Sequence, residues 1–201
     1  MKITWKDTDD GLVWPLPIEK KIDIFYQQVL GWQLHIADLI TNGGDPLGGG
    51  AKVAPIRDSG FAVLLICLSY FETIGKYQAR VDGKRKKDNE YFKAGAQAVF
   101  PFILNTPPDV RKKLLDTLWK DARCGLYHNS RTSCGVGLGQ PPNGEAMAYD
   151  PKAQKLAISP ERLPPALKDH LKHYRMELLD PTKTDARRSF EHQFDKDFGV
   201  K

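Results

Sequence analysis

The sequence predicts a mainly α-helical protein, a helical bundle with a small β-hairpin inserted in it. Three observations lead to this prediction. Apolar residues recur every three or four positions over several long segments, as they do on one face of a helix. Clusters of Gly, Pro and Asn, typical of loops, separate these segments. Two short apolar runs, 147–149 and 156–158, have instead the length of β-strands.

Composition and charge limit the class of protein. The chain has 201 residues, of which 41% are hydrophobic, enough for one domain with a sizeable core. We therefore expect a single domain over residues 1–201, with an N-terminal arm (1–16), the β-hairpin insertion (135–159) and C-terminal helices (160–201). The net charge of +5 is compatible with a polyanionic partner but does not require one.

Cysteine usage and hydropathy indicate the compartment. Three cysteines, Cys67, Cys124 and Cys134, are too few and odd in number for a disulfide framework. The N-terminus lacks the apolar stretch of a signal peptide. The longest apolar run, Phe61 to Leu68, is far shorter than the roughly 20 residues that span a bilayer. We expect a cytoplasmic protein with no membrane association.

The first two segments are an irregular arm and a long helix. Trp5 and Trp14 are expected to pin the arm to the body, because each buries a large area. From Pro17 a helix is predicted, and its apolar face is formed by Ile18, Ile22, Phe25, Val29, Trp32, Ile36 and Leu39. A glycine-rich loop (41–59) follows. It is not a phosphate-binding P-loop, since no Ser or Thr follows Lys52.

The next two helices are predicted at 61–78 and from Asn89. The first is too long and apolar for an ordinary strand. Near its end, Glu72 can pair with Lys76 at i+4 or support Arg123. Between the helices, the basic run Lys84, Arg85, Lys86 and Lys87 is either a solvated loop or a contact for nucleic-acid backbone. The helix from Asn89 has its apolar face at Phe92, Ala96, Val99 and Ile103, with Pro101 kinking its end.

A further helix is predicted from about Pro108 to the neighbourhood of Gly125. Thr106 is a candidate cap, with Asp109 completing a capping box. The two short apolar runs then form the hairpin, with a third strand near Val136. Two helices end the chain; their apolar faces are Leu167, Leu171, Tyr174 and Leu178, and Phe190, Phe194 and Phe198, the last helix being capped by Thr184.

The end of the 108–125 helix carries Arg123 and, five positions later, His128. A histidine exchanges protons near neutral pH, and the planar guanidinium of arginine can stabilise charge on a phosphate. This stretch, RCGLYHNSRTS, resembles the Arg-x4-6-His segment of the HEPN superfamily, whose members cleave or bind RNA. The resemblance covers roughly Phe61 to Asn129. It departs at Cys124, where active members often have Asn, Asp or His.

The resemblance implies a metal-independent endoribonuclease, cleaving RNA through attack of the 2′-hydroxyl. Arg123 would bind the scissile phosphate and His128 would act as general acid and base. Tyr127, Asn129, Ser130, Arg131 and Glu72 would support them, with Lys84, Arg85, Lys86 and Lys87 on the RNA backbone. No metal or cofactor is expected. Such proteins often form homodimers and serve in toxin–antitoxin or antiviral systems, which implies a cognate antitoxin or regulatory protein as a partner.

Several alternatives stay open. The main alternative is that the chain is a non-catalytic HEPN-like module that binds RNA or protein. The cysteine at position 124 favours this alternative. On an unbroken helix His128 lies about 140° around from Arg123. The pair therefore requires a helix loosened at Gly125, a cleft, or a dimer. A zinc site at Cys124, His128 and Cys134 lacks a fourth ligand, and the pair His170 and His173 lacks a third. A Cys124 thiol nucleophile paired with His128 has no separate oxyanion device.

Overall fold

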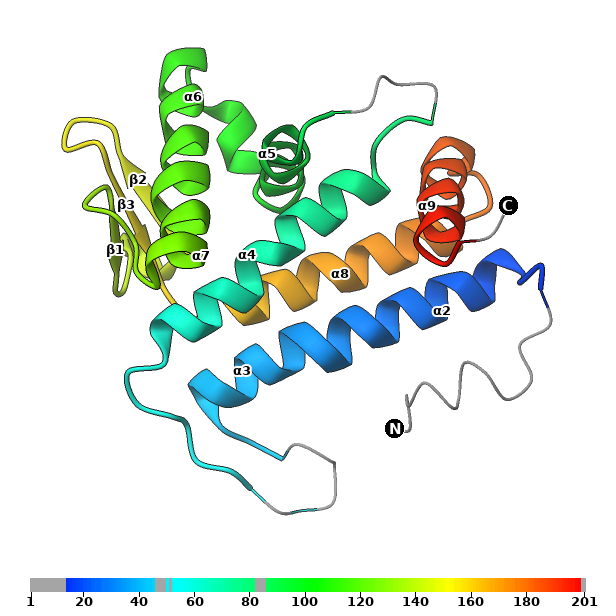
Figure 1. The fold of residues 1–201 in the computed structure, drawn as a ribbon, viewed down its shortest axis with the longest axis horizontal. Coiled ribbons are helices and arrows are strands. Elements are labelled where there is room, and N and C mark those ends of the chain that lie inside the picture. The colour runs from blue at the N-terminus through cyan, green and yellow to red at the C-terminus, as the bar shows by residue number, and fades with distance from the viewer. Residues whose placement is uncertain (1–13, 46–49, 51, 82–85, 200–201) are drawn as a thin grey trace.

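A computed structural model of the chain describes residues 14–45, 50, 52–81 and 86–199. The protein is mainly helical, as predicted, with one small sheet at its edge (Figure 1). Helix α4 (Gly60–Tyr77) lies at the centre, packed against α5 (Asp88–Val99) and against α8 (Leu163–Leu179). Trp5 of the predicted arm lies outside the described residues, whereas Trp14 packs on Phe194 and Phe198 of the last helix segment.

The first long helix contains a π-helical turn that changes the face it buries. It consists of α2 (Ile18–Val29), a π-helix (Leu30–Leu34) and α3 (His35–Asn42). The wider turn adds a residue, so Leu34 and Ala37 follow Val29 into the core. The prediction that Trp32 and Ile36 belong to the buried face was therefore wrong; they are 47% and 42% exposed.

The predicted 108–125 helix is also interrupted by a π-helix. It runs as α6 (Pro108–Thr117), a π-helix (Leu118–Cys124) and α7 (Gly125–Asn129). Thr106 does not cap it, because its hydroxyl donates to the Ile103 carbonyl and Pro107 occupies the N-cap. Before it, α5 ends at Val99 and a 3-10 helix (Pro101–Asn105) begins at the predicted breaker Pro101.

The predicted hairpin and third strand are confirmed. Strands β2 (Met147–Asp150) and β3 (Lys155–Ile158) pair antiparallel. Strand β1 (Val136–Leu138) pairs parallel with β3, which gives the order β1-β3-β2. A 3-10 turn (Pro142–Gly144) connects β1 to β2. The Asp150 carboxylate accepts hydrogen bonds from the Lys152 and Ala153 amides and so holds the hairpin turn.

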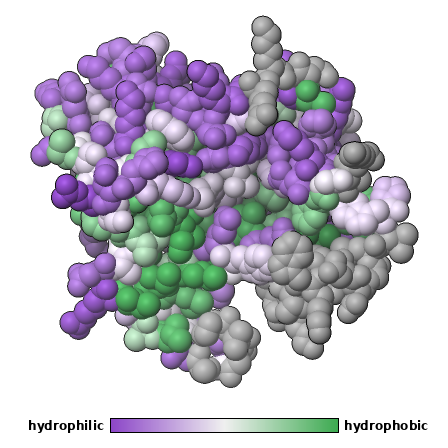
Figure 2. Space-filling view, in the orientation of Figure 1, coloured by the Kyte–Doolittle hydropathy of each residue, from purple (hydrophilic) through white to green (hydrophobic). Residues whose placement is uncertain are grey.

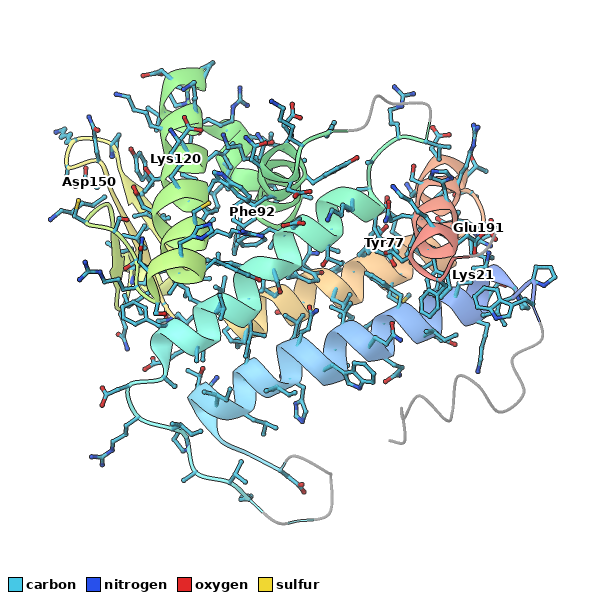
Figure 3. All side chains as sticks on the ribbon, in the orientation of Figure 1. Lys21, Tyr77, Phe92, Lys120, Asp150 and Glu191 are labelled. Carbon is cyan, nitrogen blue, oxygen red and sulfur yellow. The ribbon has the colours of Figure 1, made fainter. Side chains whose placement is uncertain are left out.

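The two C-terminal helices, α8 and α9 (Thr184–Asp197), bury the predicted apolar residues except Phe198, which follows α9 as its C-cap and is only partly buried. Lys183 rather than Thr184 occupies the N-cap of α9. A buried lysine joins α9 to α2. Lys21 is only 3% exposed, and its ammonium donates to Glu191 (2.7 Å) and Asp195 (2.9 Å) of α9 (Figure 3). Burial lowers the pKa of Lys21, but these hydrogen bonds outweigh it and raise the pKa above its ordinary value.

Helices α4 and α5 touch through two glycines. A Cβ added to Gly75 would lie 1.9 Å from the Tyr91 carbonyl oxygen, and one added to Gly95 would lie 1.8 Å from the Phe71 carbonyl oxygen. Each glycine also faces the backbone of the other. The two helix backbones are therefore in direct contact, at a separation that any side chain would increase.

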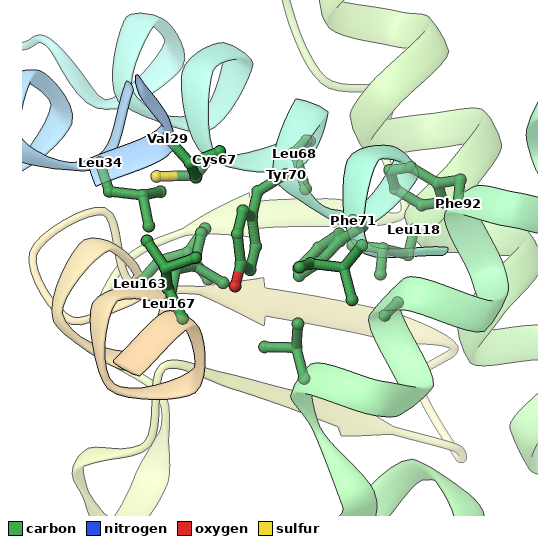
Figure 4. Close-up of a cluster of buried hydrophobic side chains, with 14 of the residues drawn as sticks. Val29, Leu34, Cys67, Leu68, Tyr70, Phe71, Phe92, Leu118, Leu163 and Leu167 are labelled. Atoms are coloured by element: carbon green, nitrogen blue, oxygen red, sulfur yellow. The ribbon is translucent and has the colours of Figure 1, made fainter. Parts of the chain in front are cut away.

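Helix α4 is the most apolar helix of the described chain. By length and composition it is the one described helix that could cross a membrane, and half of the relevant window is buried in the protein. Its buried residues, including Cys67, Tyr70 and Phe71, form the centre of the core (Figure 4). Its N-terminal half and α3 carry an apolar surface (Figure 2), where Ile36, Phe61 and Leu65 are exposed.

One polar contact lies inside this core. The Tyr70 hydroxyl is 2.8 Å from Nδ1 of His170 on α8. Tyr70 is fully buried, and burial lowers the pKa of His170 to about 4. His170 is therefore neutral at physiological pH, with Nδ1 placed to accept from the tyrosine.

We expect Gly75→Ala and Gly95→Ala each to lower the free energy of unfolding by about 2 kcal/mol or more. The clash is with backbone, which cannot rotate away, and it exceeds the gain of about 1 kcal/mol that alanine brings to a helix. Urea unfolding measures the change. Gly139→Ala is the control, since nothing lies within 4 Å of that added Cβ. Equal stability of all three variants would contradict the close crossing.

We expect His170 to make the protein less stable in acid. The folded chain takes up this proton near pH 4 and the unfolded chain near the ordinary value of 6.5. The contribution is complete above pH 6.5 and is lost as the pH falls to 4, by at most about 3 kcal/mol. His170→Gln keeps an acceptor for Tyr70 and should flatten the dependence, whereas His173→Gln, at an exposed position on α8, should not. Identical slopes for wild type and His170→Gln would refute this.

Candidate functional site

Arg123 lies in a stack of aromatic rings at the end of the π-helix. Its guanidinium lies over the ring of Tyr127, 4.2 Å from the centroid, and near the ring of Trp119, 4.9 Å from the centroid. The two aromatic residues are four positions before and after it in the sequence, a spacing that places side chains on one helix face. Trp119 was not singled out from the sequence for this site, although its i−4 spacing from Arg123 was the signal for the contact.

The same guanidinium is paired with the carboxylate predicted as its support. Nη2 of Arg123 donates to Oε2 of Glu72 on α4 at 3.2 Å. Both side chains are largely covered, at 22% and 18% exposed. The other oxygen of Glu72 accepts from Lys76 at 2.6 Å, so this carboxylate joins two cations. The structure thus brings Arg123, Tyr127 and Glu72 together in one contact group.

Aromatic packing fixes the position of this group. The ring of Phe92 on α5 packs edge-on against Phe71 of α4 (5.5 Å between centroids) and against Trp119 (5.1 Å). The Trp119 ring in turn contacts the guanidinium of Arg123. The guanidinium is therefore held by the core of the bundle on one side, and the half-exposed Tyr127 ring covers the other.

The remaining predicted residues form the exposed end of α7. His128, Asn129, Ser130 and Arg131 are all exposed. Within the described ranges, the His128 side chain makes no hydrogen bond or ion pair. Ser130 adopts the left-handed conformation (φ 55°) and its amide bonds the Leu126 carbonyl, which ends the helix.

The Arg123 and His128 side chains have no hydrogen-bond or stacking partner in common. The helix is widened before Gly125, not at it, and Gly125 itself is helical (φ −56°, ψ −47°). Gly125 serves a close approach instead, because a Cβ there would lie 2.8 Å from the Arg131 carbonyl oxygen. From Arg123 to His128 the backbone is helical, so the two side chains project in different directions, Arg123 towards α4 and His128 into solvent.

The predicted basic run lies partly outside the described residues, namely Lys84 and Arg85. Lys86 and Lys87 are exposed at the start of α5, and the Lys87 amide donates to Glu90. Among the residues described, no group of three or more His, Cys, Asp or Glu side chains could hold a metal ion. His170 and His173 in particular have separate partners, Tyr70 and the Asp169 carbonyl.

Comparison of the chain with protein-family models, with curated proteins and with solved structures found no match. The HEPN resemblance of the Arg123–His128 segment therefore stays a prediction.

We expect Arg123 and Glu72 to be energetically coupled by about 1 kcal/mol, since both are mostly covered. A double-mutant cycle with Arg123→Gln and Glu72→Gln, followed by urea unfolding, measures this. The more exposed pair of Arg175 and Asp23 is the control and should give only a few tenths of a kcal/mol. Zero coupling at Arg123 would show that the pair does not hold the site together.

Proposed function

We propose that this protein binds single-stranded RNA at the end of α7. The observation that carries the proposal is the Tyr127 ring, 51% exposed and backed by the guanidinium of Arg123. RNA-binding proteins stack unpaired bases on such rings, and each stacked base contributes about 1–3 kcal/mol. A cation behind the ring keeps it in place and adds positive potential.

The neighbouring side chains suit the same ligand. Arg131 and Lys120 are exposed cations on either side of the motif, and cations of this kind provide most of the non-specific affinity for a phosphate backbone. Asn129 and Ser130 supply exposed donors and acceptors that can bond base edges. The overall charge of +5 has the sign that an RNA ligand requires.

Endoribonuclease activity is the second candidate, and the exposed His128 favours it. An imidazole with no described partner is available to take the proton of a 2′-hydroxyl. The contact of Arg123 with Glu72 weighs against it, because the guanidinium must then leave or share this carboxylate to reach a phosphate. Cleavage therefore requires a second subunit or a rearranged Arg123. A homodimer and a regulatory partner such as an antitoxin belong to this candidate.

We expect a short fluorescent single-stranded RNA to bind the wild type in an anisotropy titration. Tyr127→Ala and Arg131→Ala should each raise Kd about tenfold, through loss of stacking and of a phosphate contact. The matched controls on α8 are Met176→Ala, an exposed apolar residue, and Lys172→Ala, an exposed cation; neither should change Kd. No binding by the wild type, or equal losses in the controls, would refute the proposal.

The same RNA incubated in EDTA tests the second candidate. Cleavage by the wild type that His128→Ala abolishes, with RNA binding retained, would establish the nuclease. Binding without cleavage leaves the RNA-binding module, because the expected mechanism needs no metal.

A further inference from the structure

A second cationic site lies at the opposite end of α4 from its N-terminal apolar surface. Beyond the end of α4, a pocket of about 150 Å³ opens between this helix, Tyr91 of α5 and one face of α9. Figure 1 shows α9 lying beside the C-terminal end of α4. Three cations, Lys76, Arg80 and Lys196, line the pocket together with His192, and no carboxylate does.

The sequence of α9 separates its charges between two faces. Glu191 and Asp195 point to α2, where both accept from Lys21. Ser189, His192, Gln193 and Lys196 follow the i, i+3, i+4 and i+7 spacing of a single face, and all four line the pocket. Because Phe190 and Phe194 are fully buried, the rotation of α9 is fixed and this face cannot turn away.

Two of the three cations, and the histidine, have no polar partner. Arg80, Lys196 and His192 are exposed and make no hydrogen bond or ion pair with any other residue in the described part of the chain. Lys76 is the exception, since it donates to Glu72 and lies 3.9 Å from Asp88. The pocket thus gathers positive charge that the protein itself does not neutralise, which is unfavourable unless an anion or solvent ions compensate for it.

A largely buried serine also lines this pocket. Ser189 is only 7% exposed, and its hydroxyl is a group that can donate to a phosphate oxygen. Gln193 and Tyr91 also belong to the lining. Nε2 of Gln193 donates to the Asp197 carboxylate (2.7 Å) and the Tyr91 hydroxyl accepts from the Lys86 amide (3.2 Å), so each keeps one N–H or O–H for a ligand.

One feature opposes an anion here. The C-terminal end of a helix carries partial negative charge, and α4 ends at this pocket. Two of its last carbonyls are already used, however: the Gln78 amide bonds the Ile74 carbonyl, and the Ala79 amide bonds the Lys76 carbonyl. The positive charge of Lys76, Arg80 and Lys196 exceeds the partial negative charge of the carbonyls that stay free at this helix end.

We propose that this pocket binds a phosphate group. Its size excludes a whole drug-sized ligand, for which sites measure about 300–1,000 Å³. Its donors are the guanidinium, ammonium and hydroxyl groups that phosphate oxygens accept from. The phosphate comes either from a small molecule or from the 5′ end of a nucleic acid. The site is separate from Arg123 and Tyr127 and does not depend on the RNA proposal.

The test is an amide NMR titration of the full chain at constant ionic strength with inorganic phosphate. We expect saturable shifts confined to residues 76–81, Tyr91 and 189–196. The variant Arg80→Gln/Lys196→Gln should raise the phosphate Kd about tenfold or more. The control Lys113→Gln/Lys172→Gln removes the same charge at exposed sites and should leave Kd unchanged. Thermal unfolding of each variant verifies that it is folded.

Further arms identify the source of the phosphate. A nucleoside 5′-monophosphate tests a small ligand, and a short RNA with a 5′-phosphate, compared with the same RNA ending in a 5′-hydroxyl, tests a nucleic-acid end. If one probe binds more tightly than free phosphate, and the pocket variant loses this tighter binding, that probe identifies the source of the phosphate. No saturable shift with any probe, or equal losses in the pocket and control variants, would overturn the proposal. Tyr127→Ala should leave phosphate binding unchanged, which separates this result from failure of the RNA site.

Discussion

The backbone contact between α4 and α5 at Gly75 and Gly95 is the constraint on which the rest of the structure depends. It lets the two helices approach until their carbonyls and amides touch. At this separation Phe92 packs against Phe71 on one side and Trp119 on the other. The Trp119 ring then contacts the Arg123 guanidinium, which donates a hydrogen bond to Glu72 of α4. Packing in the core therefore determines the geometry of the site. Two glycines, which have no side chain, set the position of the Arg123 guanidinium near the surface.

Glu72 connects the two cationic surfaces of the molecule. One of its oxygens holds Arg123, beneath the proposed RNA-binding ring, and the other holds Lys76, which lines the proposed phosphate pocket. In the free protein the Glu72 carboxylate accepts a hydrogen bond from each of the two cations. An anion that draws either cation away would leave the carboxylate with a single partner. The two surfaces are therefore joined through one side chain, although each is built from its own set of residues.

Much of the fold follows from the spacing of apolar residues. The stripe of α8, from Leu167 to Leu178, and the phenylalanines of α9 lie in the core as the 3.6-residue period requires. The two π-helices could not be predicted in this way, because a period fitted to regular helix assigns Trp32 to the face that Leu34 in fact occupies. The glycine contact was equally hidden. Gly75 and Gly95 are 20 positions apart and no local pattern marks them as neighbours. Burial of Lys21 could not be predicted either, because its partners come from α9, far along the chain. For the site, the sequence singled out Arg123, Glu72 and Tyr127, whereas Trp119 and the pocket beside α9 depend on how helices meet in space.

The central claim is that the exposed end of α7, with Tyr127 backed by Arg123, is a surface for RNA. Mapping a short single-stranded RNA onto the protein by amide NMR tests it most directly, because it asks where the ligand sits before any residue is changed. We expect saturable shifts centred on residues 119–131, with the Trp119 indole among them. Shifts that avoid this segment, or no saturable shift at all, would contradict it.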